Sequence, residues 1–280
     1  MLRKGLAAFA AALIVAGLAA TAPAAEEPPF RLAAPPFPAP ASSPAPSGTA
    51  LRLVSSSELR GDDAAWIRRN GLRLREYAVP GSYSENATLE RLPGHVPTSY
   101  RGLRIVRAIA QARTTLAIYG RDFASGRLLV AIDTAGRVRY ALDFINYGRA
   151  PLGSLLYQEV VWVAEADGVL YVQTGHATYA RDSRGRNGYV AAIDLATRRL
   201  IWRTPALVAN AISFELVGGA LATGYGFTAE PDYLYLLSRR TGKPLARLAV
   251  PTAPDLLLRK GSLLHVRTHD RDLVVRVAAA

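Results

Sequence analysis

The sequence contains no cysteine. This absence excludes disulfides, thiolate-bound metals, a cysteine nucleophile and a lipid-modified N-terminal cysteine. Three common signatures are also absent: a Gly-x-Ser-x-Gly nucleophile elbow, a phosphate-binding Gly-x-x-x-x-Gly-Lys loop and a dinucleotide fingerprint after a strand. Beyond Pro28, every hydrophobic run is short and interrupted by charge, so no later segment is expected to span a membrane. The fold must therefore rest on its packed core.

The N-terminus has the three parts of a secretory signal. Arg3 and Lys4 precede the apolar run Leu6–Leu18, and small residues up to Ala24 form a cleavage site. The alternative is a membrane anchor, but the run is broken at Pro23 and falls short of the ~20 apolar residues of a spanning helix. We therefore expect residues 1–24 to be a signal peptide, and the mature protein to be periplasmic or secreted.

The chain is strongly basic, with 34 Lys and Arg against 22 Asp and Glu. A nucleic-acid-binding protein is expected to show a basic face interleaved with stacking aromatics, or a helix that enters a groove, and neither is visible here. The arginines are instead scattered through turns and strands. We therefore expect no nucleic-acid partner, and an anionic envelope surface fits the predicted compartment better.

After the signal, composition divides the chain in two. Residues 25–50 are rich in proline, alanine and serine, which favours a solvated polyproline II linker without a core. Residues 51–280 form the predicted β domain. In its first part, Leu51–Val54 and Leu72–Val79 alternate like strands, Asp62–Asn70 is predicted to be a short helix around Trp66, and residues 81–94 are predicted to be a loop.

From about residue 102, short β-runs alternate with turn residues. Val160–Ala164 and Val169–Thr174 flank an Asp-Gly pair at Gly168, a strong hairpin signal, and similar hairpins recur downstream. The repeats group into four units, at about residues 103–145, 159–204, 212–250 and 254–277. The last unit has three clear strands, so it lacks one.

The turns within these units share a pattern. The fullest copy has Ala192, Asp194, Thr197 and Trp202; Thr241 and Gly242 are kept in a later copy, and Asp133 marks an earlier one. The aspartate can accept backbone hydrogen bonds across the turn, glycine tolerates positive φ, and the aromatic fills a gap between sheets. We interpret these residues as structural repeat positions.

Over residues 102–277 this pattern resembles the repeat of the quinoprotein-like (PQQ-repeat, WD40-like) β-propellers. The resemblance implies that the turn joins the third and fourth strands of a blade and that the tryptophan packs between blades. The expected fold is all-β, a propeller-like repeat domain of four to five antiparallel blades. It is either incomplete, in which case the chain could oligomerise, or closed by a strand from residues 51–80 that completes the C-terminal sheet.

Candidate chemistry is sparse. His265 and His269 lie on a predicted strand, whose rise of ~3.3 Å per residue separates them too far to share one zinc ion, so no metal site is expected. Arg184 and Arg186 form a possible loop for an anionic ligand. The close carboxylate pairs Glu165/Asp167 and Glu230/Asp232 are interpreted as turn residues rather than a glycosidase pair.

The predicted function is a non-catalytic exported propeller module that mediates protein or envelope interactions. The alternative is a small periplasmic enzyme, either a quinone-dependent oxidoreductase or a sugar hydrolase or lyase, with its site on the propeller axis. No cofactor is predicted, and PQQ is not expected because the dehydrogenases with this repeat are far longer and have an adjacent cysteine pair. Three or more Asp, Glu, His or Arg side chains converging in one axial pocket would weigh against a pure scaffold.

Overall fold

The computed structural model describes residues 27–41, 50–79, 89–122, 124–148, 157–176, 179–227 and 230–278. The predicted signal peptide, part of the predicted 81–94 loop and residues 42–49 of the predicted linker lie outside these ranges. No helix among the described residues has the length and apolar character needed to cross a membrane.

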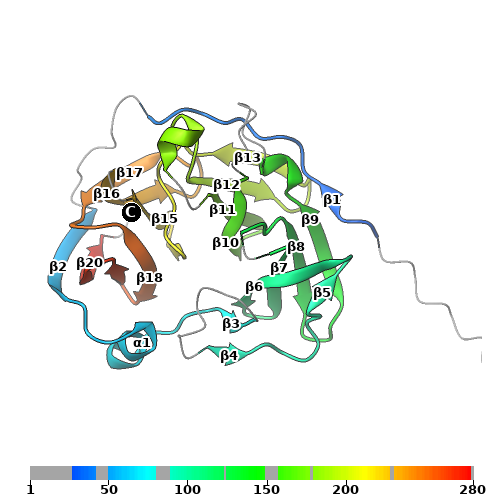
Figure 1. The fold of residues 1–280 in the computed structure, drawn as a ribbon, viewed down its shortest axis with the longest axis horizontal. Helices are drawn as coiled ribbons and strands as arrows, with labels where there is room; N and C mark the ends of the chain where they lie inside the picture. Colours follow the sequence, from blue (N-terminus) through cyan, green and yellow to red (C-terminus); the bar gives the residue numbers. More distant parts are fainter. Residues whose placement is uncertain are drawn as a thin grey trace, which may run out of the picture.

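Four antiparallel sheets are arranged around a common centre, as the blades of a β-propeller (Figure 1). In blades 1 to 3, four consecutive strands of the chain are neighbours in the sheet, and the first of them lies closest to the centre (Figure 1). Blade 1 contains β6 (Leu103–Gln111), β7 (Thr114–Gly120), β8 (Leu128–Asp133) and β9 (Val138–Asp143), with the short β5 (Ser99–Tyr100) beside β6. Blade 2 contains β10 (Glu159–Ala166), β11 (Val169–Gly175), β12 (Tyr189–Asp194) and β13 (Arg199–Arg203). Blade 3 contains β14 (Glu215–Val217), β15 (Ala220–Phe227), β16 (Glu230–Ser238) and β17 (Pro244–Ala249).

Blade 4 is completed by a strand from the other end of the domain. It contains β18 (Pro254–Lys260), β19 (Leu263–Thr268) and β20 (Arg271–Val277), and its fourth strand is β2 (Leu51–Glu58), which pairs with β20 in antiparallel register. The predicted closure by a segment within residues 51–80 is therefore confirmed. The closing strand gives β20 a hydrogen-bonding partner along an edge that would otherwise be open.

Hairpin turns follow the local sequence. In blade 2, Ala166 pairs with Val169, and the two residues between them, Asp167 and Gly168, both have positive φ, at 54° and 74°. Two consecutive residues of this kind form a type I′ turn, whose twist matches that of the flanking strands. The predicted units at about residues 103–145, 159–204, 212–250 and 254–277 agree with the strands observed in the four blades.

A helix and an extended segment connect blade 4 to blade 1 (Figure 1). Helix α1 (Asp63–Asn70) begins at Asp62, whose carboxylate accepts a hydrogen bond from the Ala65 N–H, and its buried Trp66 packs with Leu256 and Leu258 of β18. The predicted helix is therefore confirmed. The chain then runs to β3 (Tyr77–Ala78), which pairs with β4 (Glu90–Arg91), and Glu76 bridges to Ile109 of β6.

The strand predicted over Leu72–Val79 is wrong for most of its length. Only β3 is a strand; residues 72–75 lie outside any strand, and Glu76 forms an isolated bridge to Ile109. Their alternating pattern reflects packing, since Leu72 and Leu74 contact the cluster around Trp66. The same alternation that indicates a strand also fits a connector with one apolar side.

The segment 27–41 also differs from the prediction of a solvated linker, because it lies against blades 1 and 2. β1 (Phe30–Arg31) pairs in parallel with β9, and Leu32 is buried. Its carbonyls are used as acceptors: the Tyr189 hydroxyl donates to Pro38 O at 3.0 Å. Proline lacks an N–H but retains a carbonyl, so a proline-rich segment can be held by donors from a folded surface.

Candidate functional site

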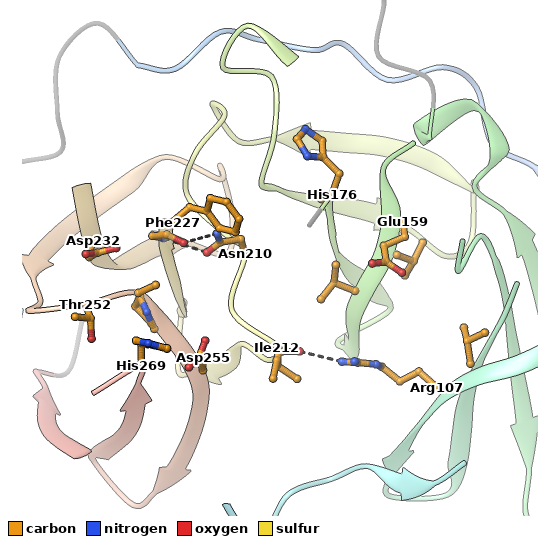
Figure 2. A pocket seen from close by; sticks show the side chains of 17 residues that line it. Arg107, Glu159, His176, Asn210, Ile212, Phe227, Asp232, Thr252, Asp255 and His269 are labelled. Carbon is orange, nitrogen blue, oxygen red and sulfur yellow. Dashed lines mark hydrogen bonds between the residues drawn. The ribbon is translucent and has the colours of Figure 1, made fainter. Parts of the chain in front are cut away.

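A cavity of about 610 Å³ lies at the centre of the ring, lined by residues from all four blades and the segments between them (Figure 2). Its walls combine apolar side chains, among them Val161, Ile212 and Phe227, with polar ones. The polar side chains are Arg107, Glu159, His176, Asn210, Asp232, Thr252, Asp255 and His269. This size is typical of small-molecule sites, which also mix apolar walls with a few polar groups.

Asn210 fixes the backbone between blades 2 and 3 at the cavity. Its side-chain amide donates to Gly226 O at 2.6 Å and accepts from Gly226 N at 3.1 Å. A Cβ atom on Gly226 would lie 2.0 Å from Oδ1 of Asp232. Glycine at this position therefore leaves the space that the Asp232 carboxylate occupies.

One side of the cavity is acidic. Figure 2 shows Asp232, Thr252, His269 and Asp255 on this side, opposite Glu159 and Arg107. The Oδ1 atom of Asp232 is buried without a hydrogen-bond partner among the described residues. Burial raises the pKa of Asp232, and the nearby Asp270 and Glu230 raise it further. Burial also raises the pKa of Asp255, although His269 and Arg267 act in the opposite direction.

On the other side, the charge of Arg107 is already compensated. Its Nε lies 3.4 Å from Oε1 of Glu76, and both side chains are buried. Arg107 also donates to Ile212 O at 3.1 Å and stacks over the Trp162 ring at 5.7 Å. These contacts join blades 1, 2 and 3 at the axis, so Arg107 is a structural cation as well as a cavity residue.

Glu159 is the cavity carboxylic acid whose pKa is raised to near neutrality. Burial raises its pKa to about 7, in spite of the opposing effect of Arg107. A group with this pKa exchanges its proton near neutrality and can either donate or accept a hydrogen bond. Among the described residues, no group of three or more His, Cys, Asp or Glu is placed to hold a metal ion.

The arginine loop predicted from sequence lies elsewhere. Arg184 follows the 3-10 helix η2 (Ala180–Ser183), is exposed and has a positive φ of 52°. The carbonyl of Arg186 accepts a hydrogen bond from the Gln158 side chain at 2.8 Å. Neither arginine lines the axial cavity.

The repeat residues lie in turns and at a blade interface. Oδ1 of Asp194 accepts from both N and Oγ1 of Thr197, which lowers the pKa of Asp194, and Asp133 accepts from the N–H groups of its own turn. Thr241 N lies 3.3 Å from the Ser238 hydroxyl. Trp202 Nε1 donates to Arg239 O of the next blade at 3.0 Å, and its ring packs against Gly242.

Sequence reasoning missed most of the cavity residues. Arg107, Glu159 and Asp255 lie on β6, β10 and β18, the innermost strands of three blades, and the polar positions on these strands are the signal that could have identified them. The sequence spacing suggests a role for His269 only together with His265, which is buried on β19 and does not line the cavity. Asp232 was assigned to a turn, whereas Glu230 and Asp232 begin strand β16 and Asp232 lines the cavity.

No protein-family model matches the sequence, and no curated protein matches it. Membership of the PQQ-repeat family therefore stays a prediction. Several solved structures are similar in fold at low identity. The computationally designed Ika4 protein is 10% identical, with 67% of this chain and 99% of that chain covered and a TM-score of 0.42. BamB from Moraxella catarrhalis is 16% identical, with 67% and 62% covered and a TM-score of 0.36.

The quinohemoprotein alcohol dehydrogenase ADHIIG from Pseudomonas putida HK5 is 17% identical, with a TM-score of 0.38. The alignment covers 57% of this chain but only 27% of the dehydrogenase, so this chain corresponds to about a quarter of that protein's length. The four sheets and their strand order establish the β-propeller fold of this chain independently of these similarities.

Proposed function

We propose that this chain is an exported, non-catalytic binding module whose axial cavity takes a small organic molecule. The observation that carries the proposal is the convergence of Arg107, Glu159, Asp232, Asp255 and His269 in one cavity. They come from separate blades and from the segments that connect strands, and apolar side chains such as Ile212 and Phe227 line the same cavity. Polar groups that converge on a concave apolar space are the usual form of a small-molecule site.

Export is proposed from the N-terminal sequence, through the predicted signal peptide at residues 1–24. A periplasmic or secreted protein is exposed to small molecules that enter from outside the cell. A ligand-binding cavity on a scaffold without thiols would function in such a compartment, because no part of the fold depends on the redox state of a cysteine.

The test is a cavity-filling substitution with a matched control. Val161 lines the cavity, whereas Val138 is exposed on the outermost strand of blade 1. A thermal-shift screen of small molecules on the wild-type protein would supply ligands, and calorimetric titration would then compare wild type, Val161→Trp and Val138→Trp. We expect binding to be lost in Val161→Trp and retained in Val138→Trp. Equal binding by all three proteins, or a screen without a ligand, would argue against the proposal, and turnover of a bound ligand would favour the enzyme alternative.

A second proposal is interaction with an acidic partner or envelope surface, and the distribution of charge favours it. The chain has a net charge of +12, whereas the cavity holds three carboxylates and one arginine, so the basic excess lies outside the cavity. Co-sedimentation with vesicles containing phosphatidylglycerol, weakened by salt and absent with phosphatidylcholine alone, is the expected result. Binding to neither kind of vesicle would remove the lipid form of this proposal.

A further inference from the structure

The two carboxylates at the acidic side of the axial cavity, the half-buried Asp232 and the exposed Asp255, have no arginine within ion-pair distance among the described residues, and only the cations His269 and Arg267 act on Asp255 from farther away. Glu76 is paired with Arg107 at 3.4 Å, and Asp272 lies 3.0 Å from Arg69 and 3.8 Å from Arg267. In the described part of the chain, no ion pair involves Asp232 or Asp255. Basic residues outnumber acidic ones by 34 to 22, so this absence of partners contrasts with the composition.

The local structure of Asp232 does not compensate its charge. Its Oδ1 atom has no donor among the described residues, and the nearest charged groups acting on it are Asp270 and Glu230, which are also acidic. Thr252 does not supply a donor to it, since its hydroxyl donates to Asp270. Burying the Oδ1 atom of Asp232 without a donor or a cation is costly, and a bound cation would offset that cost.

The cavity also has space for more than a bare ion. Ile212, Phe227 and Pro254 provide apolar surface close to the two carboxylates, within a cavity of about 610 Å³. A hydrated metal ion would leave these walls in contact with water, whereas an organic cation would bury its carbon atoms against them. The Phe227 ring adds a face that attracts cationic groups.

The opposite side of the cavity is suited to a neutral group. Arg107 is paired with Glu76 and also lies close enough to Glu159 to affect its pKa, so this side of the cavity presents no carboxylate without a nearby cation to a second cationic group of the ligand. A ligand whose second end is a hydroxyl, a carbonyl or an apolar group is compatible with both Arg107 and Glu159. The ligand therefore has one cationic end.

Resting on the proposed function, we infer that the axial cavity binds an organic amine, whose protonated nitrogen lies between Asp232 and Asp255 and whose apolar body lies against Ile212 and Phe227. The recognition has two parts. The carboxylates select charge, and the apolar wall selects a carbon skeleton over ammonium or a metal ion.

The test compares probes of one shape and different charge on the full mature protein. Hexylamine and phenylethylamine are the cationic probes, hexanol and phenylethanol the neutral ones, and hexanoate the anionic one. Calorimetric titrations would compare the wild-type protein with the variants Asp232→Asn and Asp255→Asn and with Val161→Trp, which fills the cavity. Glu58→Gln removes one exposed carboxylate on β2, outside the cavity, and is the control for net charge. Circular dichroism and thermal melting check that each variant is folded, and Asp255→Glu, which keeps the charge, is the second variant at that position.

We expect the amines to bind wild type more tightly than the neutral and anionic probes. Affinity for the amines should fall at least about tenfold in each Asn variant and in Val161→Trp, and stay unchanged in Glu58→Gln. Asp255→Glu should bind amines better than Asp255→Asn.

If the alcohols bind as well as the amines, and binding is lost only in Val161→Trp, the proposed ligand class is wrong but the cavity remains a binding site. If no probe or screened molecule is sensitive to Val161→Trp, the proposed function fails as well.

Discussion

Glu159 shows how a single side chain in this cavity couples charge to stability. Burial raises its pKa from 4.5 to about 7, and Asp122 adds to this effect while Arg107 opposes it. Between pH 4.5 and about pH 7, Glu159 is ionised in the unfolded chain but keeps its proton in the folded protein. The stability contributed by this group is fully present below about pH 4.5 and is lost as pH rises through about 7.

The first prediction concerns Glu159→Gln. Glutamine cannot ionise, so the variant should gain stability relative to wild type as pH rises from about 4.5 to about 7, by about 3 kcal/mol, and the difference should then level off. Urea unfolding of both proteins across this range measures it. The raised pKa values of Asp232 and Asp255 act in the same direction in both proteins, so the difference isolates Glu159. A difference in unfolding free energy between the two proteins that does not change with pH would contradict the raised pKa of Glu159.

The second prediction concerns Gly242, where a turn meets the Trp202 ring. Gly242 has a φ of 68°, and a Cβ atom there would lie 2.4 Å from Cε3 of Trp202. Gly261 has a similar φ of 62°, but a Cβ atom would meet nothing within 4 Å. Gly261→Ala should cost about 1 kcal/mol of unfolding free energy, and Gly242→Ala about 2 kcal/mol more. Equal losses in the two variants would show that the contact between blades 2 and 3 is not tight.

At the scale of elements, the N-terminal segment behaves as part of the propeller. The Arg203 guanidinium lies 4.3 Å from the Phe37 ring centroid and 4.0 Å from that of Tyr189, and it donates to Pro36 O at 3.1 Å. The Phe37 and Tyr189 rings also contact each other edge to face. The cluster attaches residues 36–38 to the outer strand of blade 2, whereas β1 attaches residues 30–31 to blade 1.

The third prediction follows from this cluster. Phe37→Ala should lower the unfolding free energy by about 1–2 kcal/mol, because it removes the ring from Arg203 and Tyr189. It should also make the segment before residue 42 more sensitive to proteolysis. Phe30→Ala, at a residue that is 38% exposed, is the control and should have a smaller effect. Unchanged proteolysis in Phe37→Ala would contradict attachment through this cluster.

Elements with local signals could be predicted from the sequence. The hairpins around Gly168 and Gly219 depend on residues adjacent in the chain, and helix α1 has its cap at Asp62. The position of segment 27–41 could not be predicted, since proline-rich composition does not indicate which surface donates to its carbonyls. The cavity could not be predicted either: residues from Arg107 to His269 meet only because the blades close around one axis.

At the scale of the whole molecule, the two ends of the domain are joined in blade 4. β2 pairs with β20, from the pair Leu51–Val277 to the pair Glu58–Arg271, and α1 then leads the chain from blade 4 towards blade 1 (Figure 1). The ring therefore depends on a strand that precedes the other three strands of its blade by about 200 residues in the sequence. Loss of this strand exposes the edge of β20 and the apolar residues beneath it.

The fourth prediction uses two truncations. A chain starting at Ala50 keeps β2 and should fold as a less stable monomer, since it lacks only the segment attached to blades 1 and 2. A chain starting at Leu59 lacks β2 and should aggregate or lose its cooperative thermal transition. Size-exclusion chromatography and thermal melting distinguish the two. A well-folded monomer starting at Leu59 would show that β2 is dispensable for closure.

The most direct measurement is a crystal structure of the protein with the tightest-binding amine. The account predicts electron density for the amine in the axial cavity, with its nitrogen about 2.7–3.2 Å from a carboxylate oxygen of Asp232 or Asp255 and its carbon skeleton against Ile212 and Phe227. An amine bound on the outer surface, with only water in the cavity, would contradict it.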